Sequence, residues 1–446
     1  MSKYKRYAIV VILVSNGILI SFLESFIPIP IPVPGVKLGL GNIITMIGIA
    51  FLGVKDVLFI VAIRCFVVAV LTRGVMMLAF SLTGGILSAL VMALLYKKFS
   101  GMFSVKGISI AGALVHSTAQ VIVASFILGQ FVIMYYLPVL LVSAVITGFI
   151  TGSIGEIAIN EIRRKDLFGN NRQENTDIDF GNILHSEKSD ILIKKHQILP
   201  RMDSGVKFFF AFILSIIPFL CENKISFIII SAYLILITIF SGMKVKTALT
   251  SFTAYFIIVV FPFLFGFLIS LLFYQFSGNA MFTYYQQIGD TAIRMFQLFL
   301  LWYIGCIYFN TTSMKSFIGL FDKILTPLKR FGVPVEDHLK VIMSVIKVLT
   351  QIGPEVKRNF TESMGSMSDN KKWWQRINIK GISSIIVNFI VNSFKRMDAI
   401  EKYVKEVNAA DLYGYRLKIS RLDVIASVSF VIVVLLVIII ENGYLI

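Results

Sequence analysis

The chain has 446 residues, of which 57% are hydrophobic and only 15% are charged, with a mean hydropathy of +0.83. This composition excludes an ordinary soluble globular protein, and several apolar runs reach the roughly 20 residues that cross a bilayer as a helix. Lipid admits only helices or closed barrels, and these runs are continuous rather than alternating. The sequence therefore predicts an all-α, polytopic protein of the cell membrane.

The formal net charge is +17, from 42 Lys and Arg against 25 Asp and Glu. Most basic residues stand at the ends of apolar runs or in one long polar stretch, as the positive-inside bias predicts, so the charge indicates topology and anionic lipid rather than nucleic acid. The three cysteines, Cys65, Cys221 and Cys306, lie inside apolar segments without paired spacing. We expect neither a disulfide, a metal site nor a cofactor.

Six apolar segments fill the first domain, residues 1–159. We expect them to span the membrane at about 7–26, 38–53, 55–73, 75–96, 107–129 and 131–155. With a cytoplasmic N-terminus, the loops expected inside carry most of the Lys and Arg, and only Lys37 and Arg73 fall outside. The first run is long and lacks a cleavage site of small residues, so we interpret it as a retained helix rather than a signal peptide.

A polar cytoplasmic linker, residues 160–204, separates this domain from a second one at 205–446. The second domain has apolar segments at about 205–221, 224–241, 247–275, 286–310 and 422–441, which leaves the C-terminus extracytoplasmic. Between the last two lies a basic cytoplasmic module at about 314–421. Apolar residues recur there at helical spacing in 336–360 and 382–406, which predicts amphipathic helices rather than spans.

An unusual proline-rich loop follows the first span. Prolines alternate at 28, 30, 32 and 34, which forbids a helix and removes backbone donors. We expect a stiff extended loop at the outer membrane face, acting either as a lid or gate or as a rigid connector. Glu24 precedes the loop, and Lys37 and Asn42 follow it.

Further polar groups lie within the spans. Arg64 falls well inside the third span, where a charge is expensive and often marks a pathway or a paired site. His116 and Gln120 are four residues apart and share one face of the fifth helix. Together with Glu24, Lys37 and Asn42, they predict an outward-facing pocket for a small anionic solute. The alternative is mutual satisfaction, with Arg64 paired to Glu24 and His116 bonded to Gln120 or a backbone carbonyl.

Residues 7–155 resemble the Gx transporter family, often labelled heptaprenyl diphosphate synthase component I. The motifs that carry this resemblance are Glu24-Ser, Pro28-Ile-Pro-Ile-Pro-Val-Pro-Gly35, Lys37-Leu-Gly-Leu-Gly-Asn42, Arg64, Ser81-Leu-Thr-Gly-Gly85, His116 with Gln120, and Tyr136-Leu-Pro138. The family is similar to the substrate-binding (S) components of energy-coupling factor transporters, so the resemblance implies a six-helix domain that holds its ligand in the outer half. The label also implies a link to prenyl diphosphate metabolism.

The chain lacks the sequence motifs of a prenyltransferase and of an ATPase. Prenyl transfer needs aspartate-rich motifs for Mg²⁺, and no two Asp residues are adjacent anywhere in the sequence. There is also no Gly-x4-Gly-Lys-Ser/Thr loop for ATP. We therefore expect no catalytic residue here, and any ATPase would be a separate subunit.

Residues 200–441 resemble the transmembrane (T) component of energy-coupling factor transporters, of the cobalt-transport permease type. The resemblance is carried by Leu199-Pro-Arg-Met-Asp-Ser-Gly-Val-Lys207, Arg294, Asn310-Thr-Thr-Ser313, Leu325-Thr-Pro-Leu-Lys329 and Gly332-Val-Pro334. It implies two coupling helices, each ending in an Ala-Arg-Gly-like motif whose arginine docks on an ATPase.

Both coupling motifs depart from that pattern. They read Ser363-Met-Gly365 and Leu412-Tyr-Gly414, so the glycines remain and both arginines are replaced. Neither Met nor Tyr can form the forked hydrogen bonds of a guanidinium. Arg358 or Arg416 is the candidate substitute, and we assign a coupling role to the following residues: Gly365, Asp411, Gly414 and Arg416.

These observations predict the membrane component of an energy-coupling factor transporter, in which an S-like domain is fused to a T-like domain. Its expected partners are ATP-binding cassette ATPase subunits, a small anionic and possibly isoprenoid-related solute, and membrane lipid, without nucleic acid. Two alternatives stay open. One is a non-catalytic membrane subunit associated with prenyl diphosphate synthesis, and the other is a carrier that works without ATP.

Overall fold

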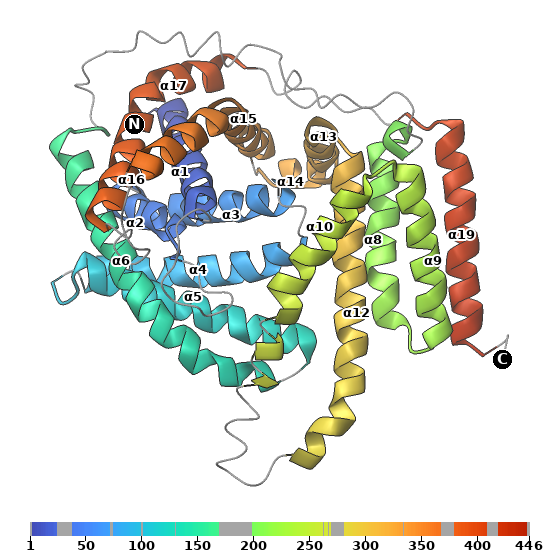
Figure 1. Ribbon diagram of the computed structural model, residues 1–446. Coiled ribbons are helices and arrows are strands. Elements are labelled where there is room, and N and C mark those ends of the chain that lie inside the picture. The colour runs from blue at the N-terminus through green and yellow to red at the C-terminus, as the bar shows by residue number, and fades with distance from the viewer. Residues whose placement is uncertain are drawn as a thin grey trace.

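The computed structural model is helical throughout the residues that it describes. Those residues are 2–24, 38–71, 75–99, 101–129, 131–168, 199–261, 263–265, 267–268, 281–332, 334–366, 379–407 and 418–443. Figure 1 shows two groups of membrane-type helices joined by a third group that covers one end of the molecule. The predicted all-α polytopic fold class is confirmed.

The first group contains the six predicted helices. They are α1 (Lys3–Glu24), α2 (Gly41–Phe51), α3 (Val54–Leu71), α4 (Val75–Lys98), α5 (Val105–Leu128) and α6 (Leu137–Arg164), with the short η1 (Phe131–Tyr136) before α6. Ser104 begins α5 by accepting a hydrogen bond from the Gly107 amide at 3.2 Å. Gly129 ends it in the left-handed conformation, φ 63°, which glycine adopts without strain.

Helices α5 and α6 approach closely because α6 carries a Gly-x-x-x-Gly pair. A Cβ on Gly148 would stand 2.8 Å from the Cα of Ile110, and one on Gly152 would stand 2.8 Å from the Cα of Lys106. Small residues at this spacing let two backbones pack directly, as is common between membrane helices. One turn of this contact also carries a polar bond, 3.0 Å between the hydroxyls of Ser109 and Thr151.

The second group is an upright set of helices. It contains η2 (Leu199–Arg201), α8 (Ser204–Leu220), α9 (Lys224–Ser241), α10 (Val245–Tyr255), η3 (Phe256–Val260), α12 (Met281–Thr311) and α19 (Arg421–Glu441). Side-chain caps begin three of them: Asp203 for α8, Asn223 for α9 and Ser420 for α19. In Figure 1 the helices α8, α9, α12 and α19 run alongside one another.

The third group is the basic module, here named the coupling module and comprising residues 314–407 of the described chain. Its helices are α13 (Met314–Ile324), α14 (Thr326–Arg330), α15 (Val335–Ser366), α16 (Ile379–Ser393), η5 (Phe394–Arg396) and α17 (Met397–Glu406). Helices were predicted at 336–360 and 382–406, and both predictions are confirmed. Each buries one face and exposes the other.

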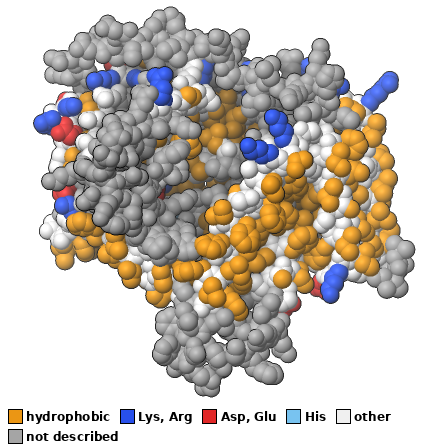
Figure 2. Space-filling view, viewed as in Figure 1, with side chains coloured by type: hydrophobic (Ala, Val, Ile, Leu, Met, Phe, Trp, Pro, Cys, Tyr) orange, Lys and Arg blue, Asp and Glu red, His pale blue; other side chains and the backbone are white. Residues whose placement is uncertain are grey.

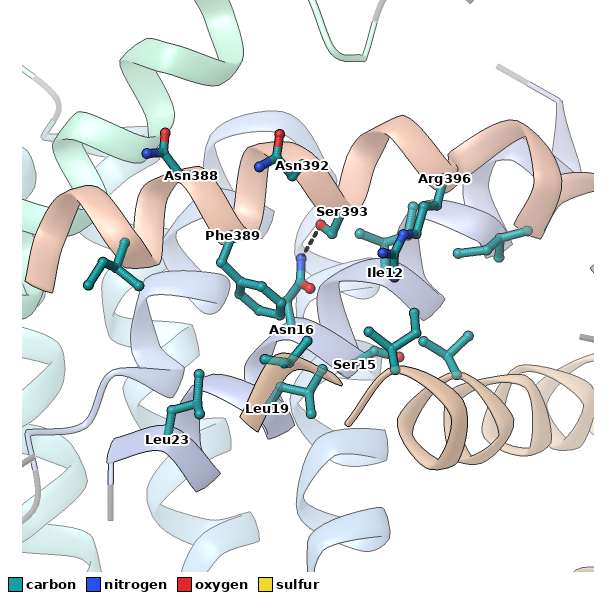
Figure 3. Close-up of a pocket in the computed structure, with 15 residues that line it drawn as sticks. Ile12, Ser15, Asn16, Leu19, Leu23, Asn388, Phe389, Asn392, Ser393 and Arg396 are labelled. Carbon is teal, nitrogen blue, oxygen red and sulfur yellow. Dashed lines mark hydrogen bonds between the residues drawn. The ribbon is translucent and has the colours of Figure 1, made fainter. Parts of the chain in front are cut away.

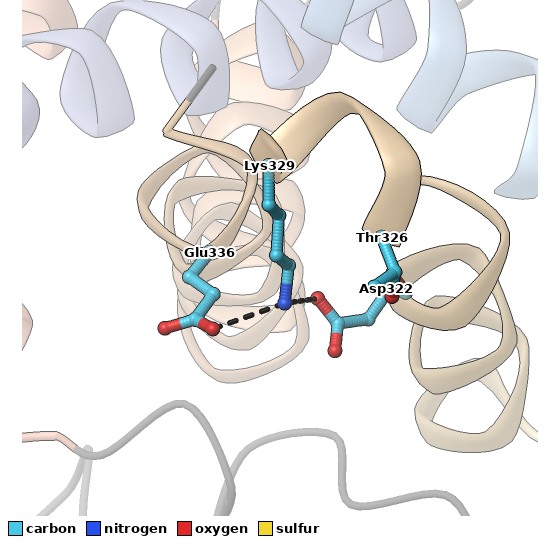
Figure 4. Close-up of polar contacts among 4 residues, drawn as sticks. All are labelled: Asp322, Thr326, Lys329 and Glu336. Carbon is cyan, nitrogen blue, oxygen red and sulfur yellow. Dashed lines mark hydrogen bonds and ion pairs between the residues drawn. The ribbon is translucent and has the colours of Figure 1, made fainter. Parts of the chain in front are cut away.

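A lysine ties the first turns of this module together. Lys329 of α14 lies 2.9 Å from an oxygen of Asp322 on α13 and 3.0 Å from an oxygen of Glu336 on α15 (Figure 4). Its hydrogen bond to Asp322 raises the pKa of the Lys329 ammonium, which therefore stays charged between the two carboxylates. The contact fixes the bend between α13 and α15 at the turn that contains Gly332, φ 77°.

The largest hydrophobic cluster joins α1, α2 and α3 to α15, α16 and α17. Helix α1 is its centre, and 83% of the apolar stretch of α1 is buried inside the protein. A second junction packs Val121 and Leu128 of α5 against Leu298 and Trp302 of α12. The first group is thus held by the coupling module at one end and by α12 at the other.

Seven described helices are long and apolar enough to cross a membrane. They are Lys3–Glu24, Leu78–Lys98, Val105–Leu128, Ile133–Arg164, Lys224–Ser241, Gly289–Thr311 and Arg421–Glu441. Eleven spans were predicted, and the other four fall on helices that are shorter or more charged, or on a segment that is described only in part. Helix α2 has 11 residues, or about 17 Å, against a hydrocarbon core of about 30 Å. Helix α8 has 17 residues, α3 carries Lys55, Asp56 and Arg64, and part of 247–275 lies outside the described residues.

Apolar and basic surfaces are separated on the face shown in Figure 2. Hydrophobic side chains cover the sides of the upright helices and the underside of the first group, while most Lys and Arg side chains gather along the end that carries the coupling module. Ser2 and Lys3 contact this module, so the N-terminal end of α1 lies on the same side as the module. That pairing agrees with the predicted topology, and which side is cytoplasmic stays a prediction.

Candidate functional site

Glu24 is the last residue of α1 and is only 6% exposed. One of its carboxylate oxygens accepts a hydrogen bond from the Gly39 amide at 2.9 Å, and the other accepts from the Leu40 amide at 3.1 Å. A carboxylate that bonds two successive backbone amides fixes the course of the chain there. Glu24 therefore holds the segment that follows the proline-rich loop, here named the 38–42 segment.

Arg64 of α3 holds the same segment from another side. Its guanidinium is 9% exposed and donates a hydrogen bond to the carbonyl oxygen of Gly41. A Cβ on Gly41 would lie 2.8 Å from both the Arg64 Nη1 and the Ser21 hydroxyl, so a larger residue here would force these groups to shift. The hydrogen bonds given to Glu24 and Arg64 thus go to the backbone of the 38–42 segment.

The 38–42 segment is a turn that starts α2. Gly39 has φ 71°, in the left-handed region, and its carbonyl accepts the Asn42 amide at 2.8 Å. Asn42 is partly exposed at the first turn of α2. Lys37 and the proline-rich loop lie outside the described residues, so their predicted place at this site is not tested.

His116 and Gln120 form a second polar group, on α5. A Cβ on Gly84 of α4 would lie 3.0 Å from the His116 Nδ1 and 3.2 Å from the Gln120 Cγ. The neighbouring Gly85 faces α3 instead, where Cys65 lies 3.3 Å from the Ser81 carbonyl oxygen. The paired glycines therefore let α4 pack against α5 on one side and α3 on the other.

The described candidate residues thus fall into two groups. Glu24, Asn42 and Arg64 meet around the 38–42 segment, whereas His116 and Gln120 meet in the contact between α4 and α5. One pocket formed by all six predicted residues stays a prediction. The sequence did not show that Glu24 and Arg64 share a partner, the backbone of the 38–42 segment.

A third polar cluster joins the two motifs singled out in the second domain. The Asp203 carboxylate caps α8 through the Gly205 amide at 2.8 Å and accepts the Lys418 amide at 3.1 Å. Four residues later, the Lys207 ammonium donates to the carbonyl oxygen of Thr311 at 2.7 Å. These hydrogen bonds join the start of α8 to the end of α12 and to the residues just before α19.

The sequence analysis missed Asp423, which completes this cluster. Its carboxylate is 1% exposed and accepts the Asp203 amide at 2.9 Å, the Ser420 amide at 2.6 Å and the Ser420 hydroxyl at 2.7 Å. A Ser-x-x-Asp pattern before an apolar run is a capping signal that could have identified it. We interpret this cluster as structural, since all its bonds join helix ends.

The structure describes only one of the four predicted coupling residues. Gly365 lies in the last turn of α15, close to the end of that helix at Ser366. Asp411, Gly414 and Arg416 lie outside the described residues. Their role stays a prediction.

Fold and site together define a polytopic α-helical membrane protein whose first helical group presents a buried glutamate, a buried arginine and a glycine-rich turn. Residues 13–157, which cover most of this group, match the family model described as heptaprenyl diphosphate synthase component I. No curated protein and no solved structure matches the chain significantly. The match supports the S-component-like reading of the first group, and the T-like reading of the second remains a hypothesis.

Proposed function

We propose that this protein is the membrane component of an energy-coupling factor transporter. In this proposal the first helical group captures a small anionic solute, and the second group with the coupling module transmits motion from separate ATPase subunits. The observation that carries the proposal is the enclosure of α1 by α15, α16 and α17. A displacement of the module therefore acts directly on this helix.

Contacts run along α1 from its first residue to its middle. Lys3 lies 2.7 Å from an oxygen of Asp337 on α15, and the Ser2 hydroxyl donates to Glu401 of α17 at 2.9 Å. Deeper in, the Asn16 amide donates to the Ser393 hydroxyl of α16 at 2.6 Å. Because three module helices hold one helix of the capture domain, force on the module reaches the 38–42 segment through Glu24 at the other end of α1.

The relative orientation of the two helical groups also favours transport. In Figure 1, α3 and α4 run across the direction of α8, α9, α12 and α19. If the upright set crosses the bilayer, then α3 and α4 lie along the membrane plane in this state. A solute site on the first group would change the side to which it opens if that group rotated toward an upright position. The proposal requires such a rotation during each cycle.

The chemistry of the first group suits an anion. Arg64 carries five N–H donors, and the structure assigns one of them to Gly41. A carboxylate or phosphate placed beside the 38–42 segment can bond the remaining donors, and Lys37, His116 and Gln120 complete the proposed ligand set. The chain itself would do no chemistry, since it has neither a nucleotide-binding loop nor an aspartate pair.

Two measurements test this function on the full chain. Affinity capture from its native membranes, followed by mass spectrometry, should identify ATP-binding cassette subunits. A double variant, Asn16→Cys with Ser393→Cys, should then lock α1 to α16 by a disulfide. We expect the lock to abolish nucleotide-driven solute uptake, because the proposed rotation of the first group has to move α1 against α16, and we expect a reductant to restore uptake. Uptake that continues unchanged in the locked protein would refute the coupling role of α1.

A second candidate function is favoured by the description of the matching family. It is a non-catalytic membrane subunit that anchors a prenyl diphosphate synthase. The same capture experiment separates the two, because this candidate requires a soluble partner with aspartate-rich motifs and no ATPase. Uptake would then be absent from vesicles that contain only the captured proteins.

A further inference from the structure

A cavity of about 400 Å³ lies between α1 and the coupling module (Figure 3). Its volume is within the range of small-molecule sites, about 300–1,000 Å³. The walls come from α1 on one side and from α15, α16, η5 and α17 on the other. The cavity therefore forms only where the capture domain and the module meet.

One end of the cavity is polar. Ser15 and Asn16 of α1 are each only 2% exposed, although both face this space. The Asn16 amide donates to the Ser393 hydroxyl at 2.6 Å, and Arg396 lines the same end (Figure 3). Three helical elements thus bring amide, hydroxyl and guanidinium groups together inside an otherwise apolar contact.

The Ser15 hydroxyl is a buried hydrogen-bonding group at this end of the cavity. Serines in membrane helices usually bond the carbonyl four residues earlier, as Ser21 does with Gly17 at 2.7 Å. The Ser15 oxygen is buried and has no hydrogen-bond partner among the described residues. A buried hydroxyl without a partner is destabilising, so a polar group inside the cavity would satisfy it.

The charge and shape of the lining limit the ligand class. Arg396 is the one charged side chain among the described residues that line the cavity, and no carboxylate lines it there. Leu19 and Phe389 line an apolar part of the cavity, and the side chains of Asn388 and Asn392, which also border it, point away from Asn16 in Figure 3. A positive, hydrogen-bonding end and an apolar end suit a molecule with an anionic head and a hydrocarbon chain.

We propose that this cavity binds an anionic amphiphile with a phosphate or carboxylate head. The head would lie between Arg396, Asn16 and the Ser15 hydroxyl, and the chain would pack between Leu19 and Phe389. Bound there, the molecule would contact α1 and α16 at once and strengthen the junction between the two parts. Both a membrane phospholipid and a water-soluble phosphorylated metabolite have this chemistry.

The test uses the purified full chain in a neutral maltoside detergent, with labelled decyl phosphate as the probe. Decanol has the hydrocarbon chain without the phosphate, and inorganic phosphate has the head without the chain. Each should bind at least tenfold more weakly than decyl phosphate. Arg396→Gln should weaken decyl phosphate binding at least tenfold. The matched control is Lys395→Gln, because Lys395 is the adjacent exposed cation and does not line the cavity.

A second variant tests the apolar end. Leu19→Trp places a bulky aromatic side chain in the cavity and should abolish binding of decyl phosphate. The thermal unfolding temperature of this variant shows whether it is folded. If that variant is unfolded, the pair Arg396→Gln and Lys395→Gln still decides the matter. Equal binding by these two variants, or no saturable binding by the unchanged protein, would overturn the proposal.

The source of the ligand is decided by native mass spectrometry of protein purified from membranes. A retained anionic phospholipid that is present in the unchanged protein and in Lys395→Gln, and lost in Arg396→Gln, identifies a lipid. Displacement of decyl phosphate by geranyl phosphate without any retained lipid identifies a soluble metabolite. Both outcomes support the site, and they separate its two possible occupants.

Discussion

Helices α1 and α19 have nearly the same length and are both apolar, yet they have different surroundings. In α1, 83% of the apolar stretch is buried within the protein, whereas in α19 the share is 22%. Both helices are apolar enough to be candidates for crossing a membrane, but hydropathy does not show whether protein or lipid surrounds them. Protein covers α1, and the exposed apolar face of α19 is suited to lipid.

The two helices are also attached in different ways. Helix α19 is fixed mainly at its ends, by Asp423 at the first turn and by Glu441, which accepts the Glu222 and Asn223 amides at 3.0 and 3.1 Å. Between them, Phe430 stacks on Phe210 with ring centroids 4.5 Å apart. By contrast, α1 is packed along its length and carries buried polar groups. The attachment of α1 is therefore spread along the helix, whereas that of α19 is concentrated at its two ends.

The largest effect expected from this comparison is on core packing. Leu13 of α1 is fully buried, at 0% exposed, and Leu435 of α19 is 52% exposed. Leu13→Ala should lower the free energy of unfolding by about 2–5 kcal/mol, because it leaves a cavity that protein cannot fill. Leu435→Ala is the matched control and should change it far less. Equal losses in thermal or detergent unfolding would show that the two helices have the same surroundings.

A smaller effect is expected where α19 is fixed at its first turn. Asp423→Asn replaces one carboxylate oxygen by a donor that faces other donors, the amides of Asp203 and Ser420. A buried group left without its partner costs about 1–3 kcal/mol. We expect a loss of this size and earlier proteolysis between the coupling module and α19. Asp290→Asn, at an exposed position on α12, should be neutral.

The turn beside the end of α1 gives a third and smaller effect. Gly41→Ala would place a methyl group 2.8 Å from the Arg64 Nη1 and the Ser21 hydroxyl. Overpacking costs about 1–3 kcal/mol, and the flexibility of the arginine favours the lower value. Gly53→Ala is the control, since its Cβ would meet only Asp56 Oδ2 at 3.7 Å. A stable Gly41→Ala protein with unchanged solute binding would contradict the proposed role of the 38–42 segment.

Secondary-structure elements that depend on the local spacing of apolar residues could be predicted from the sequence. The first six helices and the amphipathic character of 336–360 and 382–406 follow from apolar spacing, and all are found near the expected bounds. Apolar content alone does not distinguish lipid contact from burial in protein, so a predicted span can fall on a helix that is too short to cross a membrane. Helix α2, which is short and almost wholly buried, is an example.

The candidate site was predicted less well, for a physical reason. Arg64 was recognised as a costly charge inside a span, and Glu24 was placed at the start of the outer loop. A sequence does not show that their partners are the backbone of Gly39, Leu40 and Gly41. The cavity at Asn16 depends on Ser393, which is 377 residues away along the chain. Contacts at that separation follow from how the domains pack, and no local pattern encodes them.

The smallest expected effect concerns pH and the covering of the first group by α15. His338 packs against Phe59 of α3, with ring centroids 4.5 Å apart, and its burial lowers the pKa of the imidazole below the ordinary value of 6.5. The unfolded chain then binds more protons than the folded one as the pH falls through 6.5, so folded stability decreases in that direction.

Lowering the pH from 7.5 to 5.5 should therefore lower the unfolding temperature, and His338→Gln should reduce this dependence. Lys340→Gln, a control on the same helix, should keep it. If His338→Gln and the unchanged protein had the same pH profile, the imidazole would titrate alike in the folded and the unfolded chain, and its packing against Phe59 would not make the stability depend on pH.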